Sequence, residues 1–232
     1  MSNQPPIEVP QGAIRLNTDS QKLEFYAQDR WFEMATDVPT LDGGARAVSQ
    51  ASTPSTNAID LITIATAGNA TDFGDAATAL TGRYGASSRT RGIFAGGGTP
   101  SRVNNIEFIT FATTGNGTVF GDMITATRGP TGAASNTRGL MATSASGTNN
   151  IEFITMATSG NSKRFGDLTT SRGEILAGGT SNNVRAIFAG GGTSDVIDQV
   201  KIASEGNAID FGNLSVSRSN TAAVSNAHGG LS

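Results

Sequence analysis

Four copies of one pattern, each about 46 residues long, constrain this chain more than any other feature. An arginine opens each copy, in "RAVSQAST" at Arg46, "RGIFAGGG" at Arg91, "RGLMATSA" at Arg138 and "RAIFAGGG" at Arg185, at spacings of 45, 47 and 47 residues. Four further landmarks follow in one order: Ile59, Ile106, Ile151 and Ile197; Gly68, Gly115, Gly160 and Gly206; Phe73, Phe120, Phe165 and Phe211; and Arg83, Arg128, Arg172 and Arg218. One structural unit is therefore expected four times.

Each copy predicts short β-strands. "GIFAGGG" is an apolar run ended by glycine, "IEFITFAT" is β-branched and aromatic, and "TGNGTVFGD" predicts a hairpin through its Gly-Asn turn. "GPTGAASNT" is a weaker candidate for a fourth strand. Four short strands in about 46 residues are typical of one propeller blade. Because no segment has helical periodicity, we expect an all-β fold.

The strand that begins with isoleucine carries an acid at its second position in every copy: Asp60, Glu107, Glu152 and Asp198. With the repeated arginines Arg91, Arg138 and Arg185, these acids suggest one structural charge pair per unit. A catalytic carboxylate would be unique, whereas these occur four times. The fourth and sixth positions of the strand, as in Ile62 and Ile64, should pack on a neighbouring unit, and the variable third position should face outward.

The glycine triplet resembles a phosphate-binding loop only superficially. Such a loop leads into a helix N-terminus and is followed by Lys and Ser or Thr. After Gly98 the chain instead reads "TPSRVNNIEFIT", which predicts a turn and then a strand. The triplet is interpreted as a turn that ends a strand.

Several kinds of chemistry lack their residues. The chain has no cysteine and one histidine, His228, which occupies a repeat position, so the usual zinc, copper and haem ligand sets are missing. No G-x-S-x-G motif occurs, and Asp75, Asp122 and Asp167, with Asn213 in the fourth copy, recur as turn residues. We predict no catalytic residue, no cofactor and no metal. A net charge of −3 argues against nucleic acid as a partner, and no apolar run is long enough for membrane insertion.

The first 42 residues form a different segment. "GAIRLNTDSQKLEFYAQDRWFEM" predicts a small three-stranded meander, and "DVPTLDGG" (37–44) a linker. The domains are expected at 1–42 and 43–232. The meander carries large apolar residues that so small a sheet cannot bury alone, namely Leu23, Phe25, Trp31, Phe32 and Met34. We expect a partner to cover them; packing against the chain's own repeat domain is the alternative.

The pattern of strand, glycines, loop, apolar-acidic strand and arginine resembles the kelch motif, although its usual Tyr and Trp are missing. "RGIFAGGG", "IEFITFATTGNGTVFGD" and "SNAHGGLS" resemble more closely the kelch-like repeat proteins of tailed phages of marine bacteria, cyanobacteria especially. The first 42 residues resemble a "G-x-I-R-x-N-T-D" element of phage fibre proteins, where it serves attachment or oligomerisation, often threefold.

The resemblance implies a virion structural protein, of the tail-fibre or capsid-decoration type, assembled in the host cytoplasm. Its partners would be other virion proteins and copies of itself, with a trimer favoured, and host surface glycan. It would not be an enzyme. The alternatives are a polysaccharide depolymerase on the same particle and a bacterial surface or periplasmic propeller.

The expected architecture is a kelch-like four-bladed β-propeller. The first copy lacks its glycine turn, and the last residues of the chain, "AVSNAHGGLS", read as a fifth copy would begin. This arrangement fits ring closure, with the C-terminal segment supplying a strand to the blade that begins near Ala45. The alternatives are an open stack of sheets and repeats that share strands between the chains of a trimer.

Overall fold

The computed structural model describes residues 9–17, 22–33, 45–50, 56–98, 100–143, 147–172, 178–219 and 221–225. These residues form 18 strands in five antiparallel sheets, and none of them lies in a helix. The prediction of an all-β fold is confirmed. The chain divides into two compact units, Met1–Leu41 and Asp42–Ser232, one residue before the expected boundary.

The first unit is a three-stranded meander of β1 (Ile14–Asn17), β2 (Lys22–Ala27) and β3 (Arg30–Glu33), as the sequence predicts. Strands β2 and β3 are joined by a two-residue turn at Gln28 and Asp29, whose φ angles are 50° and 60°. Two left-handed residues in succession match the right-handed twist of the strands they connect. The turn fixes the register that pairs Phe25 with Phe32.

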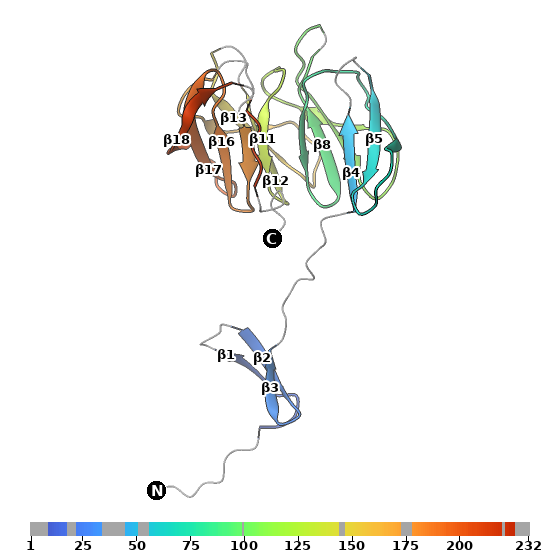
Figure 1. The fold of residues 1–232 in the computed structure, drawn as a ribbon, viewed down its shortest axis with the longest axis vertical. Helices are drawn as coiled ribbons and strands as arrows, with labels where there is room; N and C mark the ends of the chain where they lie inside the picture. The colour runs from blue at the N-terminus through green and yellow to red at the C-terminus, as the bar shows by residue number, and fades with distance from the viewer. Residues whose placement is uncertain are drawn as a thin grey trace, which may run out of the picture. The chain divides into compact units, whose positions relative to one another are not determined.

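The second unit contains the other four sheets, each a meander in chain order (Figure 1). The first holds β4 (Arg46–Gln50), β5 (Ala58–Thr63) and β6 (Thr71–Asp75). The second holds β7 (Tyr84–Ser87), β8 (Arg91–Ala95), β9 (Asn105–Thr110) and β10 (Thr118–Asp122). The third holds β11 (Thr131–Ala134), β12 (Arg138–Ala142), β13 (Asn150–Thr155) and β14 (Lys163–Asp167). The fourth holds β15 (Gly178–Ser181), β16 (Arg185–Ala189), β17 (Ser194–Lys201) and β18 (Ile209–Arg218).

The sheets do not begin where the sequence repeat begins. The weak strand candidate in "GPTGAASNT" is present as β11, but it pairs with β12 and so belongs to the following sheet. Strands β7 and β15 take the same place in the second and fourth sheets. The second, third and fourth sheets therefore each contain the last strand of one sequence copy and the first three strands of the next. This overlap links consecutive copies through backbone hydrogen bonds.

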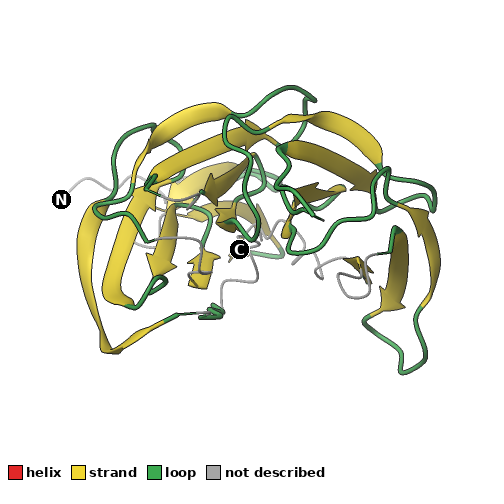
Figure 2. Ribbon diagram, turned by 90° about the horizontal axis from the view of Figure 1, so that it is seen from above, coloured by secondary structure: helices red, strands yellow, loops and turns green. Residues whose placement is uncertain are grey.

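The hydrophobic core lies between consecutive sheets, which follow one another along a curved path (Figure 2). Three clusters of buried residues join the first sheet to the second, the second to the third, and the third to the fourth. Ile59, Ile106, Ile151 and Phe188 are fully buried members of these clusters. The prediction that the fourth strand position packs on a neighbouring unit is confirmed at Ile109, Ile154 and Val200, but not at Ile62, which is 41% exposed.

The expectation for the third position is wrong. Phe153, expected to face outward, is only 5% exposed and packs edge-on against Phe165, with ring centroids 5.9 Å apart. Phe108 is partly buried against Phe120 in the same way. A sheet in the middle of the row is covered on both faces, so both sides of its strands contribute to a core.

The glycine triplets end their strands, as the sequence predicts. Gly96 and Gly97 have φ angles of 64° and 105°, values that residues with a side chain rarely adopt. The chain then passes through Arg102 to strand β9 without a described helical residue. A phosphate-binding helix N-terminus is therefore not formed in the described part of this connection.

Candidate functional site

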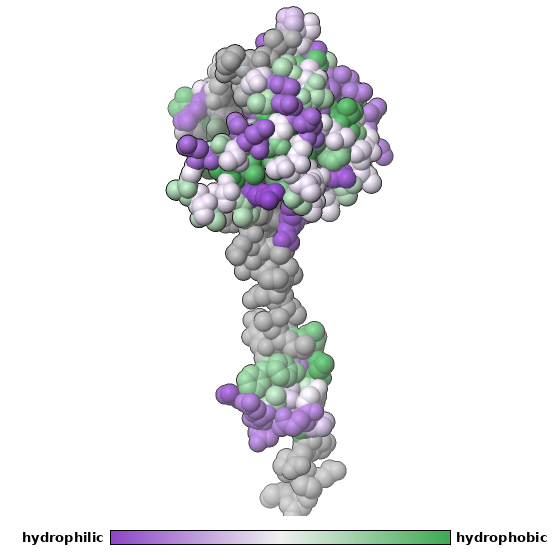
Figure 3. Space-filling model, turned by 90° about the vertical axis from the view of Figure 1, so that its right-hand side faces the viewer, coloured by the Kyte–Doolittle hydropathy of each residue, from purple (hydrophilic) through white to green (hydrophobic). Residues whose placement is uncertain are grey.

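The N-terminal sheet has two faces of different chemistry. Ile14, Leu16, Leu23 and Phe25 alternate onto one face and are 64%, 59%, 41% and 36% exposed. Phe32 joins them by stacking on Phe25, with ring centroids 5.5 Å apart. We call these five residues the apolar face. Figure 3 shows hydrophobic residues in green beside hydrophilic residues in purple on this small unit.

The opposite face is held by polar and aromatic contacts. Arg15 lies 4.1 Å above the ring of Trp31 and donates a hydrogen bond of 2.7 Å to Glu24. Trp31 packs edge-on against Tyr26. Hydrogen bonds from Asn17 and Arg15 lower the pKa of the Glu24 carboxyl below its ordinary value. The polar groups of this face pair with one another. On the apolar face, Arg30 lies over the Phe32 ring, 4.7 Å from its centroid, and the other four side chains are at least 36% exposed.

The structure separates the residues expected to form one partner interface. Leu23, Phe25 and Phe32 lie on the apolar face, but Trp31 lies on the opposite face beneath Arg15. Met34 lies outside the described residues. Ile14 and Leu16 belong to the apolar face and were missed, although their alternation with Arg15 and Asn17 in "IRLN" was a period-two signal that could have found them.

Three of the repeated acids join one sheet to the preceding one. Glu107, Glu152 and Asp198 are at most 1% exposed. Their carboxylates accept hydrogen bonds from backbone N–H groups of the preceding sequence copy: Ala77 to Glu107 at 3.1 Å, Ile124 and Thr125 to Glu152 at 2.9 and 3.0 Å, and Thr169 to Asp198 at 3.3 Å. The fourth acid, Asp60, is half-buried in the first sheet. Through these hydrogen bonds, each of the three buried acids connects its own sheet to the preceding sheet.

Two of these acids also form buried ion pairs. Arg83 Nη1 lies 3.2 Å from Glu107 Oε2, and Arg172 Nη2 lies 2.6 Å from Asp198 Oδ2. Burial lowers the pKa of both arginines, and the adjacent carboxylates oppose that effect. Arginine stays charged under such a shift, so each pair remains ionic. The equivalent Arg128 donates instead to the carbonyls of Gly98 and Pro100.

The arginines expected to pair with the acids have another role. Arg91 donates to the Met156 carbonyl at 3.2 Å and Arg138 to the Ile202 carbonyl at 3.1 Å, each in the next sequence copy. They also lie over the rings of Phe108 and Phe153, at 4.6 and 4.7 Å from the centroids. Arg185, on the last sheet, is exposed. The ion pairs are thus formed by Arg83 and Arg172, the arginines that follow the Phe-Gly pair. Their fixed place in the repeat was the sequence signal that could have identified them.

The described part of the chain holds no candidate metal centre. Within it, no group of three or more His, Cys, Asp or Glu could hold a metal ion. His228 lies outside the described residues. Searched over the same residues, the structure contains no helix that is long and apolar enough to span a membrane.

The candidate functional surfaces are therefore the apolar face of the N-terminal sheet and the two ends of the row of repeat sheets. Comparison of the chain with models of protein families and with curated proteins finds no match to either.

Proposed function

We propose that this chain is a structural component of a phage virion, of the tail-fibre or capsid-decoration type. Its N-terminal sheet would dock it onto the particle, and its repeat sheets would contact the host surface or neighbouring subunits. It would act as a binding and scaffolding protein, without catalysis.

The observation that carries the docking role is the apolar face. Five large apolar side chains share one side of a three-stranded sheet, and the described residues of its unit add no second layer. Exposed apolar surface of this kind marks an interaction site in a stable protein. Its occupants would be other virion proteins and further copies of the chain, with a trimer favoured.

The proposal of a non-enzymatic role is supported by how the repeated acids are used. Glu107, Glu152 and Asp198 are buried and bound to backbone N–H groups or arginine. A glycosidase needs two carboxylates that face one substrate cleft. Carboxylates held within the interfaces between sheets are poorly placed for that chemistry.

The fold proposed for the repeats is a closed, kelch-like four-bladed propeller. Three sheets have four strands in the order expected of blades, and the first sheet has three. The connection after the glycines differs between copies, as "TPSRVNN", "SASGTNN" and "TSD". Small hydroxyl and amide side chains on such loops suit weak, multivalent contacts with a surface glycan.

Gold-labelled antibody against the repeat unit, applied to particles released from cells that carry the gene, tests the virion role. Labelling at a fixed position on the particles is expected. Antigen found only outside the particles would overturn the proposal. Release of reducing ends from the host polysaccharide by the purified chain would replace it with the depolymerase alternative.

A further inference from the structure

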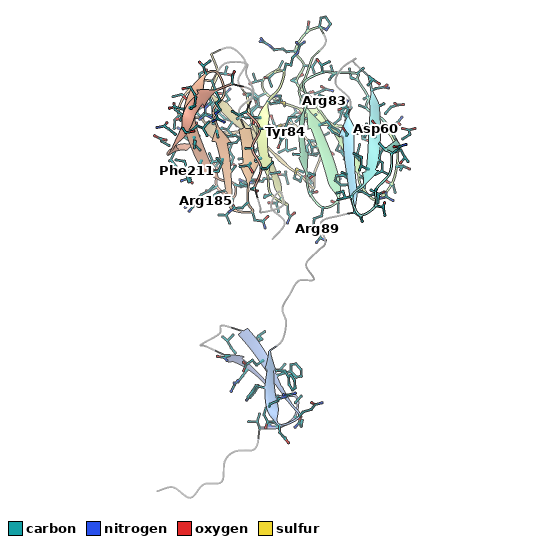
Figure 4. All side chains as sticks on the ribbon, viewed as in Figure 1. Asp60, Arg83, Tyr84, Arg89, Arg185 and Phe211 are labelled. Atoms are coloured by element: carbon teal, nitrogen blue, oxygen red, sulfur yellow. The ribbon has the colours of Figure 1, made fainter. Side chains whose placement is uncertain are left out.

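We infer that the last repeat sheet docks onto the first sheet of the same chain through a fourth copy of the interface already seen three times. The inference rests on the proposal that the four sheets are blades of one propeller. The inference adds which residues of the last and first sheets contact each other. Figure 4 labels Phe211 and Arg185 on the last sheet and Asp60 on the first, at the two ends of the row.

The repeated Phe-Gly pair shows one end of this missing interface. Phe73, Phe120 and Phe165 are 3%, 3% and 4% exposed, whereas Phe211 is 57% exposed. The glycine that follows each of the first three phenylalanines lies so close to the Gly-Asn pair of the next copy that an added Cβ would collide with its carbonyl. An added Cβ at Gly212 would have no such neighbour within 4 Å.

The other end shows the complementary surface. Ile62 and Ile64 of the first sheet are 41% and 65% exposed. Their equivalents in the later sheets include Ile109, Ile154 and Ile202, each at most 2% exposed because a preceding sheet covers them. The exposed phenylalanine at one end and the exposed isoleucines at the other occupy the repeat positions whose equivalents form the internal clusters.

The polar contacts of the interface are specified residue by residue. Backbone N–H groups of Asp75, Asp122 and Asp167 donate to the side-chain oxygens of Asn116, Asn161 and Asn207, at 3.0, 3.0 and 3.1 Å. The matching groups at the two ends are Asn213 N–H and Asn69 Oδ1. Arg46, Arg91 and Arg138 donate to the carbonyls of Phe111, Met156 and Ile202. Arg185 would donate to the Ile64 carbonyl.

The acid completes the match. Ala77, Ile124 and Thr169 donate their backbone N–H groups to the acids of the next copy. By the same spacing Ser215 N–H would donate to Asp60, the half-buried fourth acid. At this place β18 continues to Arg218, with a register shift in its pairing to β17 between Asn213 and Arg218, whereas β6, β10 and β14 end at Asp75, Asp122 and Asp167. In the first three copies, the acid of the next sheet binds a backbone N–H group just after the strand ends. We expect Asp60 to end β18 near Asn213 in the same way.

Two cavities indicate that the partner is the same chain. We call β7, β11 and β15, the first strands of their sheets, the inner strands. A cavity of about 1020 Å³ is lined by β4, by β7 and by the segment that follows β7, beside the β4 edge, where the described residues form no inner strand. A second cavity, of about 340 Å³, is lined by residues of β7, β11 and β15 and by Ala223, Val224 and Ser225. Ser225 donates to the Ser181 carbonyl of β15 at 2.9 Å. Residues 223–225 thus line one cavity together with the three inner strands, and their pairing with β4 would give the first sheet its fourth strand.

A disulfide cross-link in the full chain tests this inference, since the chain has no cysteine of its own. The pair Ala76→Cys with Gly117→Cys is the control, because a Cβ at Gly117 would lie 3.4 Å from the Ala76 Cα across an observed interface. By the repeat, Leu214→Cys with Ala70→Cys spans the proposed interface. We expect oxidation to link both pairs within one chain, with equal yield and increased electrophoretic mobility.

Links between chains at the Leu214 and Ala70 pair would overturn the inference, because they assign the partner surface to a second copy. No link at this pair, with the control pair linked, would overturn it as well. Hydrogen exchange on the unaltered chain needs no variant: Gly68 and Ala70 amides should be as protected as those of Gly115 and Gly117, which donate to Phe73 and Asp75 carbonyls. Rapid exchange at Gly68 and Ala70 contradicts closure. The gold-labelling experiment tests the virion role, and its outcome does not depend on the result of the cross-link or of the hydrogen exchange.

Discussion

Phe25 in the N-terminal sheet and Phe165 in the third repeat sheet are both aromatic residues in short antiparallel strands, yet Phe25 is 36% exposed and Phe165 4%. The repeat sheets cover one another, and each of the three interfaces adds to the apolar cluster a buried acid, which is paired with a buried arginine side chain at two of them. The described residues of the N-terminal unit place no second layer against the apolar face of its sheet. Stability is therefore expected to reside in the repeats, and assembly in the N-terminal sheet.

The largest effect should come from the repeat core. Phe165→Ala should lower the free energy of unfolding of the repeat unit by about 4 kcal/mol, because it removes a buried aromatic ring and leaves a cavity. Denaturant unfolding followed by circular dichroism measures this change. Phe25→Ala is the matched control and should leave that transition in place. Equal destabilisation by both substitutions would contradict the division of roles.

The buried ion pair gives the next effect. Asp198→Asn should destabilise the repeat unit by about 3 kcal/mol, because Arg172 would keep its charge at a site with 1% side-chain exposure. The exposed Glu205 offers a control, and Glu205→Gln should change the same unfolding midpoint little. If Asp198→Asn were as mild as the control, the pair would not hold the third and fourth sheets together.

The apolar face should affect assembly without affecting folding. Leu16→Ser with Leu23→Ser replaces two exposed residues that face each other across β1 and β2. Without these two apolar side chains, the association free energy should be weaker by about 3 kcal/mol per chain, which lowers self-association by roughly a hundredfold. Sedimentation velocity measures association, and thermal unfolding of the repeats should not change. Val119→Ser with Ile124→Ser, which are 67% and 58% exposed in the repeat unit, is the control and should keep the assembly.

The smallest effect concerns pH. The pKa of Glu24 is lowered in the folded sheet, so its contribution to stability is present above the ordinary value of 4.5 and is lost as pH falls through the lowered pKa. Protonation would release Arg15, which lies over Trp31, the single tryptophan of the chain. Tryptophan fluorescence should therefore change below pH 4.5. Glu24→Gln should abolish that transition, and its persistence in this variant would assign it to another group.

Much of the fold could be predicted because the repeat supplies four observations of each position. Glycine after a strand, isoleucine at alternate positions and the Gly-Asn and Phe-Gly pairs all indicated strands in the right order. The start of each sheet could not be predicted in this way. Sequence similarity gives the length of a repeat but not the residue at which each structural unit begins. The strand beginning at Thr131 therefore reads as the end of one unit, although it pairs with β12 of the next.

The charged positions were identified, but their partners were not. Fixed arginines occur twice in each copy, and the sequence does not distinguish Arg91, which binds a carbonyl, from Arg83, which binds Glu107. The choice depends on which sheet faces which, a long-range property. Trp31 was likewise grouped with Phe32 by hydrophobicity alone, although adjacent residues of a strand point to opposite faces.

The mass of the intact chain in solution tests the central claim most directly. The account predicts an oligomer, with a trimer of three times the 23.7 kDa chain mass, that dissociates when Leu16 and Leu23 are replaced by serine. A monomer at every concentration, with the same mass for the unaltered chain and the variant, would contradict the claim that the apolar face of the N-terminal sheet is an assembly surface.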